Sequence, residues 1–148
     1  MQQTDKEKSI LHTVEQLPQS SVTLSINRTT KRLLLLQNGQ IIAQYPIAIG
    51  KPGWETPPGQ FAVNEMIVNP TWKHPITGEL VPPGTQNPMG THWIGFVQDN
   101  QGNKIGLHGT NDNSSIGKAA SHGCLRMRNQ DIGQLYDQVE IGTTVIVQ

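Results

Sequence analysis

The chain has 148 residues, close to the commonest size of a single domain, so one hydrophobic core is expected. Its 11 Lys and Arg balance its 11 Asp and Glu without a long run of like charge, which argues against a nucleic-acid or anionic-membrane partner. No segment reaches the roughly 18 to 20 apolar residues that span a bilayer, and residues 1–20 lack the basic start and apolar centre of a signal peptide. We therefore expect neither an integral membrane segment nor an export signal in this chain.

The N-terminal segment predicts a short amphipathic helix. Apolar residues recur at helical spacing between residues 5 and 17, and Pro18 ends the pattern. The alternative is an irregular tail with a few apolar residues. Residues 1–20 are therefore set apart as a tail or short helix, and residues 21–148 are predicted to form the folded domain.

Strand signals begin directly after this segment. Apolar and polar residues alternate from Val22 to Asn27. Asn38-Gly39 joins the β-rich runs 31–37 and 40–49, and it suits a type I′ hairpin because both central positions of that turn need positive φ. Another extended run, residues 60–68, is predicted as one further strand.

Residues 69–91 contain five prolines and three glycines, which is too irregular for a central strand or helix. A loop of this length in a compact domain is usually functional. The alternative is a tolerated surface insertion.

The C-terminal part returns to regular elements. Residues 92–97 and 104–108 predict a strand pair, and residues 143–147 predict a terminal strand. Between them, a helix is expected to begin at Asn129 or Gln130, with an apolar stripe of Ile132, Leu135, Tyr136 and Val139. The class is mainly β, with one mainly antiparallel sheet structure.

The chain has a single cysteine, Cys124, so it forms no intramolecular disulfide and contains no CxxC pair. A nearby imidazole can take the proton of a thiol and leave a thiolate–imidazolium pair that attacks carbonyl carbon. His108 ends a predicted strand, and strand alternation would bring His122 to the same side as Cys124. Gly123 permits a sharp turn that would aim the amides of residues 123 and 124 at an oxyanion.

Two other interpretations of this cysteine stay open. Cys124 would be an inert, small buried side chain. Alternatively, His108, His122 and Cys124 would bind zinc with one coordination position open.

Several segments closely resemble the signature of the L,D-transpeptidase, or YkuD, family. The strongest are LHGTN at 107–111, IGKAASHGCLRM at 116–127 and IGTTVIV at 141–147. YPIAIGKPGWETPPGQF, NPMGTHWIGF and the predicted helix extend the resemblance over roughly residues 21–148. It implies a β-sandwich or barrel with one or two short helices.

The resemblance also implies an activity on peptidoglycan stem peptides in the bacterial cell envelope. The cysteine attacks the carbonyl between the third and fourth residues of a stem tetrapeptide, D-alanine leaves, and the acyl group passes to an amine or to water. No cofactor and no metal are implied. Papain-like and NlpC-type peptidases fit less well, because they place the nucleophile before the catalytic histidine and no histidine follows Cys124. A non-catalytic wall-binding module is the remaining alternative.

The resemblance also implies roles for the residues at the matching positions of this sequence. Cys124 is the implied nucleophile, His108 the base, and His122 a second catalytic histidine. Gly123 and Ser121 shape the motif and its oxyanion amides. The residues expected to contact substrate are Arg126, Gly109, Thr110 and Trp93.

Arg126 marks a departure from part of the family, since some members carry asparagine two places after the cysteine. Its guanidinium suits a substrate carboxylate, and the alternative is a structural salt bridge.

Overall fold

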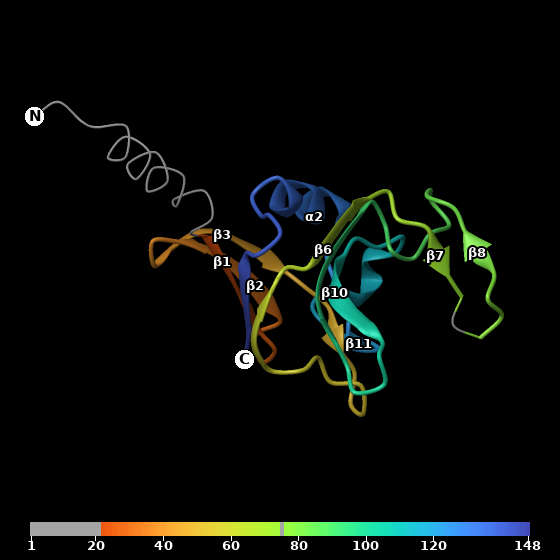
Figure 1. Ribbon diagram of the computed structural model, residues 1–148, viewed down its shortest axis with the longest axis horizontal. Coiled ribbons are helices and arrows are strands. Elements are labelled where there is room, and N and C mark those ends of the chain that lie inside the picture. The colour runs from red at the N-terminus through yellow and green to blue at the C-terminus, as the bar shows by residue number, and fades with distance from the viewer. Residues whose placement is uncertain (1–21, 75) are drawn as a thin grey trace, which may run out of the picture.

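The computed structural model describes residues 22–74 and 76–148. The predicted N-terminal helix lies outside these residues. The described part consists mainly of strands with a single α-helix, which confirms the predicted class (Figure 1). Within it, no helix has the length and apolarity that crossing a membrane requires.

The larger sheet has five strands in the order β3-β2-β1-β13-β5. Their bounds are β1 (Val22–Asn27), β2 (Arg32–Gln37), β3 (Gln40–Pro46), β5 (Gly59–Ala62) and β13 (Thr144–Val147). The β2–β3 hairpin is confirmed, and its turn residues Asn38 and Gly39 both have positive φ, at 52° and 77°. The type I′ requirement therefore identified this turn correctly.

The second sheet has four strands in the order β12-β10-β9-β6. Their bounds are β6 (Glu65–Val68), β9 (His92–Gln98), β10 (Lys104–His108) and β12 (Leu125–Arg126). The predicted strand 60–68 is in fact two strands in two sheets. The amide of Val63 donates to the carbonyl of Thr143, just before β13 of the first sheet, whereas the amide of Asn64 donates to the carbonyl of Gly95 in the second, so the chain changes sheets here.

Two small sheets complete the described strands: β4 (Ile49–Gly50) pairs with β11 (Ala119–Ser121), and β7 (Trp72–Lys73) with β8 (Leu80–Val81). One mainly antiparallel sheet structure was expected. The pairing is mainly antiparallel, but the described strands form several sheets, and β1–β13, β10–β12 and β4–β11 are parallel pairs. Their partners lie far apart in the chain or are separated by a long excursion, as parallel pairing requires.

The core lies between the two main sheets. Fully buried side chains from the first sheet include Leu24 and Leu35, and the second contributes Ile94 and Leu107. The rings of Phe61 and Phe96 meet across the gap, with centroids 5.5 Å apart. The hydrophobic face of each sheet is thus covered by the other.

The helix α2 (Asn129–Tyr136) adds the buried Ile132 and Leu135 to this core. It begins where the sequence predicted and packs along β9 and β10. Val139, expected on its apolar stripe, lies beyond the helix but is buried. A short 3-10 helix, η1 (Asn113–Ser115), precedes the cysteine segment.

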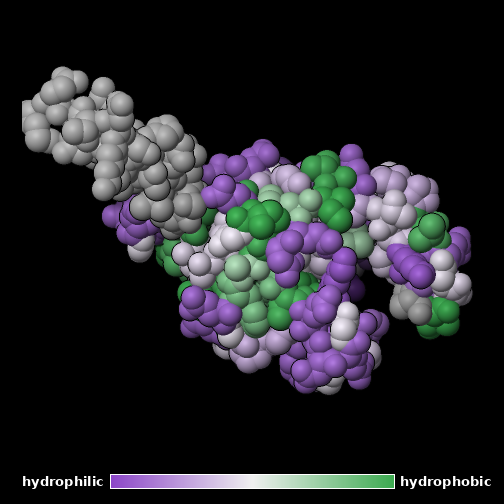
Figure 2. All heavy atoms as spheres, in the orientation of Figure 1, coloured by the Kyte–Doolittle hydropathy of each residue, from purple (hydrophilic) through white to green (hydrophobic). Residues whose placement is uncertain are grey.

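The proline-rich segment forms an arm that carries β7 and β8 away from the body of the fold (Figure 1). Asn87, fully buried at its base, donates to the carbonyl of Pro70 at 2.9 Å. Ile76 and Leu80 on this segment are exposed. Figure 2 shows hydrophobic spots interspersed with hydrophilic surface at the outer end of the arm. The segment is therefore more regular than predicted, and its functional role stays a prediction.

Candidate active site

The face of the second sheet that points away from the core carries the candidate site. Ile94 and Leu107 alternate toward the core, so their neighbours on β9 and β10 point to the opposite face. Trp93 pairs with His108, and His108 pairs with Arg126 on β12. Directly paired residues share a face, so these three side chains form one row across three strands.

Cys124 immediately precedes β12 and lies beside β10. Leu125 pairs with Leu107, which places Cys124 next to Gly106, two residues before His108 on the same strand. Two strand residues span about 7 Å, so the backbone beside Cys124 lies about that far along β10 from His108. The thiol donates a hydrogen bond to the carbonyl of Lys104 at 3.5 Å, so in this structure it is not turned to His108.

A tight turn presents the cysteine. The Ser121 hydroxyl, almost fully buried, donates to the carbonyl of Cys124 and accepts from the amide of Gly123 at 3.1 Å. Gly123 has φ of +117°, and a Cβ there would lie 3.0 Å from the Ile105 side chain. A side chain at this position would therefore be strained in both conformation and space.

Thr56 fixes the same turn from the neighbouring loop. Its buried hydroxyl donates to the carbonyl of Gly123 at 2.8 Å and accepts from the amide of Gly50 at 3.2 Å. The amide of Gly123 is already bound to Ser121, so an oxyanion role for that amide would require the bond to be exchanged. The oxyanion assignment stays a prediction.

The ring of His108 is buried and held in one tautomer. Its Nδ1 lies 2.5 Å from the carbonyl oxygen of Gly109. Because a carbonyl only accepts, Nδ1 must carry the proton, which leaves Nε2 as the basic nitrogen. Burial, together with the nearby charge of Arg126, lowers the pKa of His108 to about 4 although the Gly109 contact opposes this shift.

The thiol is also neutral at rest. Burial raises the pKa of Cys124, and the amide of Gly106 and the charge of Arg126 oppose that rise only in part. The sequence suggested a preformed thiolate–imidazolium pair. The electrostatics instead favour a thiol beside a neutral imidazole. Arg126 acts on both groups, which places all three side chains around one site.

The depressed pKa of His108 predicts a specific pH dependence of stability. The unfolded chain protonates this ring near its ordinary pKa of 6.5, whereas the folded chain does so only near 4. Between these values the unfolded state binds more protons, so acid favours unfolding. The free energy of unfolding should be greatest above about pH 6.5 and lose about 3 kcal/mol through this group by about pH 4.

Urea denaturation at several pH values would test this expectation on the wild type and on His108→Gln. The variant lacks the titrating ring but keeps the other ionisable groups, so its stability should fall less with acid. Parallel losses in the two proteins would contradict a buried, neutral His108.

His122 does not follow strand alternation. It is exposed, and its ring packs on Trp54 with centroids 4.6 Å apart. Residues 122–124 lie outside any strand, and the positive φ of Gly123 redirects the chain between His122 and the cysteine. The two-residue repeat therefore does not apply here, and a catalytic role for His122 stays a prediction.

The residues predicted to contact substrate differ in exposure and in their bonds to the rest of the protein. Arg126 is half-buried in the site row, whereas Trp93, in the same row, is only 4% exposed. The hydroxyl of Thr110 is occupied within its own turn, donating to the carbonyl of Asp112 and accepting from its amide. The side chains of Trp93 and Thr110 are thus bound within the protein, and their contact with substrate is untested.

Asn129 was not predicted as part of the site. Its side-chain oxygen accepts from the amides of Thr91 and Thr110 at 3.2 and 3.1 Å. A Cβ on Gly109 would lie 2.0 Å from the same oxygen, so only glycine fits there. Asn129, the first residue of α2, thereby holds in place the backbone around Gly109, whose carbonyl orients His108.

Several of these contacts have no clear signal in the amino-acid sequence. Thr56 lies in a turn motif that indicated only a bend, and the Gly109 carbonyl is a backbone group that composition cannot identify. Glu65, which accepts from the Trp93 indole at 2.7 Å, is remote in sequence from the motif.

The zinc interpretation gains no support from the geometry. Across residues 22–74 and 76–148, no three His, Cys, Asp or Glu side chains are grouped so that they could hold a metal ion. The exposed ring of His122 packs on Trp54 instead.

Comparison with known proteins decides the family. The YkuD family model, described as the L,D-transpeptidase catalytic domain, matches residues 21–147. The chain belongs to the YkuD family. The match covers nearly every described residue, so the fold and the candidate site both lie inside it.

Named relatives agree with this assignment. The candidate L,D-transpeptidase YqjB of Bacillus subtilis is 35% identical over 124 residues, covering 82% of this chain and 68% of YqjB. The protein named probable L,D-transpeptidase YbiS of Escherichia coli is 35% identical over 134 residues, covering 81% of this chain but 42% of YbiS. This YkuD-family chain therefore spans only part of its relatives' length.

Solved structures show the same fold. An L,D-transpeptidase from Mycobacterium smegmatis superimposes with a TM-score of 0.69 at 21% identity, covering 86% of this chain and 58% of the other. One from Stackebrandtia nassauensis gives 0.63 at 24% identity, covering 86% and 55%. At this level of identity the likeness establishes the architecture of the YkuD-family chain and nothing finer.

Proposed function

We propose that this YkuD-family chain is a peptidoglycan L,D-transpeptidase, with Cys124 as nucleophile and His108 as general base. The observation that carries the proposal is the fixed tautomer of His108. Its Nδ1 is bound to the Gly109 carbonyl, so Nε2 is free to take a proton, and the cysteine immediately precedes the neighbouring strand β12, beside Gly106. These are the two groups that thiol-based acyl transfer requires.

The reaction begins with proton transfer. A rotation about the Cα–Cβ bond of Cys124 takes the thiol from the Lys104 carbonyl toward His108, whose Nε2 accepts the thiol proton. The sulfur then bonds the carbonyl carbon between the third and fourth residues of a stem tetrapeptide. Because both groups rest uncharged, the thiolate forms only as this transfer occurs.

Collapse of the tetrahedral intermediate breaks the peptide C–N bond. The imidazolium of His108 returns its proton to the leaving nitrogen, and D-alanine departs, leaving an acyl thioester on Cys124. An amine of a second stem peptide then attacks the thioester carbonyl and loses a proton to His108. The C–S bond breaks, and His108 passes the proton to the departing sulfur. The products are a cross-linked peptide and the free thiol; water as acceptor gives a tripeptide instead.

Arg126 supplies positive charge to this site. It is half-buried and lies beside His108 in the strand register. Its charge adds to the burial that lowers the pKa of His108 and opposes the burial that raises the pKa of Cys124. Stem peptides carry carboxylates, which a guanidinium binds through paired hydrogen bonds. We assign Arg126 to the substrate carboxylate, and the catalytic domain to residues 21–148.

Incubation of the chain with a disaccharide tetrapeptide tests the function. Mass spectrometry of the protein should show a transient acyl adduct, and that of the products should show loss of D-alanine. Dimers would identify an amine acceptor, and tripeptides would identify water. Folded, reduced protein that gives neither adduct nor product would contradict the proposal and favour a non-catalytic wall-binding module.

The substrate also sets the expected location. Peptidoglycan stem peptides occur in the bacterial cell envelope, so we propose that the chain acts there. Fractionation of cells that express the native gene tests this: recovery of the protein with the envelope is expected, and recovery only with cytosol would contradict it.

A further inference from the structure

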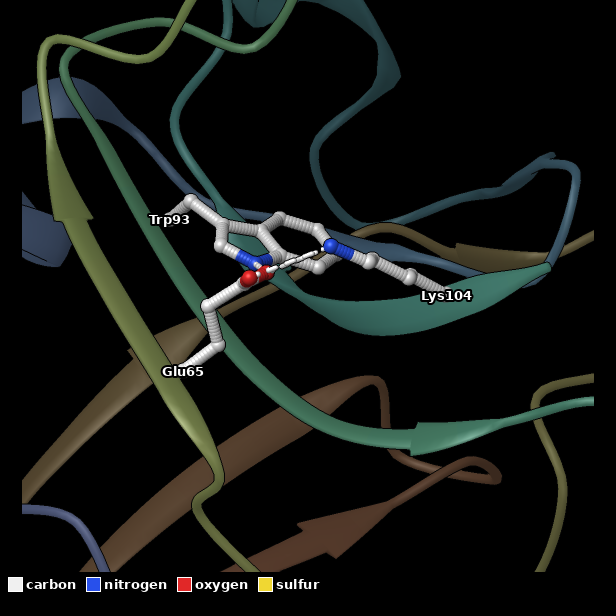
Figure 3. A network of polar contacts seen from close by, with 3 residues as sticks. All are labelled: Glu65, Trp93 and Lys104. Atoms are coloured by element: carbon white, nitrogen blue, oxygen red, sulfur yellow. Dashed lines mark hydrogen bonds and ion pairs between the residues drawn. The ribbon is translucent and has the colours of Figure 1, made fainter.

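Three strands place a polar cluster beside the candidate site, made of Glu65 from β6, Trp93 from β9 and Lys104 from β10 (Figure 3). The indole Nε1 of Trp93 donates to Glu65 Oε1 at 2.7 Å, and Lys104 Nζ lies 3.1 Å from Glu65 Oε2. The hydrogen bond from Lys104, helped by that from Trp93, lowers the pKa of Glu65. The carboxylate is therefore ionised at neutral pH and satisfied on both oxygens.

The indole is fixed flat over the strands on this face. Trp93 is 4% exposed. A Cβ on Gly106 would approach its ring to 2.9 Å, and one on Gly95 would approach the indole nitrogen to 3.0 Å. These two glycines leave the space that the indole occupies, and the Glu65 bond sets its rotation within that space.

This fixed indole contacts the proposed base. The rings of Trp93 and His108 stack with centroids 6.2 Å apart and an interplanar angle of 27°. Gly106 connects the indole to the nucleophile, because it lies against the ring and its amide interacts with the thiol of Cys124. The indole thus lies along one side of His108 and against the Gly106 backbone that faces the thiol.

We propose that Trp93, held by Glu65, is a positioning residue for His108. The indole covers one side of the imidazole, excludes water from it, and keeps the ring in the orientation that the Gly109 carbonyl requires. Lys104 keeps the Glu65 carboxylate in place. Trp93 thus acts through His108 and not on substrate, and its catalytic effect rests on the proposed function of His108 as base.

The charged and titratable groups around the His108 ring come from β6, β10 and β12. Arg126 of β12 lies beside the ring, and Cys124 precedes the same strand. Glu65 and Lys104 lie across the indole. The helix α2 contributes an uncharged side chain, the amide of Asn129, whose oxygen accepts from the Thr110 backbone amide.

NMR of the full chain with ¹⁵N-labelled histidine tests the proposal without any substrate. Wild-type His108 should show a single tautomer and a pKa near 4. Trp93→Phe and Glu65→Ala should mix the tautomers and raise the pKa by about one unit, because water reaches the ring. Glu65→Gln keeps an acceptor for the indole and should restore most of the wild-type behaviour. Trp72→Phe, in the β7–β8 arm, is the matched control and should leave the His108 signals unchanged.

Kinetics supply the second readout. Trp93→Phe and Glu65→Ala should lower kcat about tenfold with little change in KM, and should move the acid limb of the pH profile upward. Unchanged tautomer, pKa and kcat in folded Trp93→Phe and Glu65→Ala would overturn the proposal. If Trp93→Phe fails to fold, the two Glu65 variants decide.

Failure of the proposed function would look different. Wild-type protein would then lack turnover that depends on Cys124, whereas the NMR titration would still show whether Trp93 and Glu65 position His108.

Discussion

Replacing Cys124 with alanine is expected to lower turnover of a stem tetrapeptide by more than about a thousandfold, because no other group can form the thioester. The described structure places the thiol beside the strand that carries His108, and this is the chain's single cysteine. The acyl adduct seen by protein mass spectrometry should disappear together with the D-alanine product. Loss of both in a folded variant would tie the reaction to this sulfur.

Folding of the variant is the necessary control. Cys124 is half-buried. The turn around it is held by the Ser121 hydroxyl, which donates to the backbone carbonyl of Cys124, and this bond does not involve the thiol. Ala should therefore fit the turn. Circular dichroism and urea denaturation should show a native fold with a loss of about 1 kcal/mol. Cys124→Ser keeps the shape of the side chain with a far weaker nucleophile, and it should also be inactive. Turnover retained in either variant would refute the mechanism.

Local rules predicted the parts of the fold that depend on neighbouring residues. The β2–β3 turn follows from Asn38-Gly39 because its two positive φ angles are a local requirement. The start of α2 and the strands β9 and β10 follow from periodicity in the same way. The change of sheet at Val63 and Asn64 has no such signal, since both residues continue an extended pattern and only their partners differ.

The candidate site shows the same division. The Gly123-Cys124 motif and His108 are visible as residue types that suit acyl transfer. Their ionisation is not visible, because the neutral state of His108 comes from burial beneath a fold that brings Arg126 alongside. Strand alternation failed for His122 because a single glycine with positive φ turns the chain between it and Cys124.

Removing the proposed base, His108, should have the second largest effect on turnover. His108→Gln is expected to lower kcat/KM by about a hundredfold to ten-thousandfold, the usual contribution of a general base, because glutamine cannot accept the thiol proton. The amide side chain is close in size to the imidazole and can still donate to the Gly109 carbonyl, so the loss reflects chemistry more than packing.

The wild-type pH profile gives the same test without a mutation. His108 must be uncharged to accept a proton, and its folded pKa is about 4. As pH falls through this value the ring becomes protonated, so kcat/KM should stay level through neutral pH and fall only near pH 4. An ordinary exposed histidine would instead give a fall near pH 6.5. A limb at that higher value would show that the base is not the buried, Gly109-bound ring, whereas a limb near pH 4 that vanishes in His108→Gln would assign the proton transfer to it.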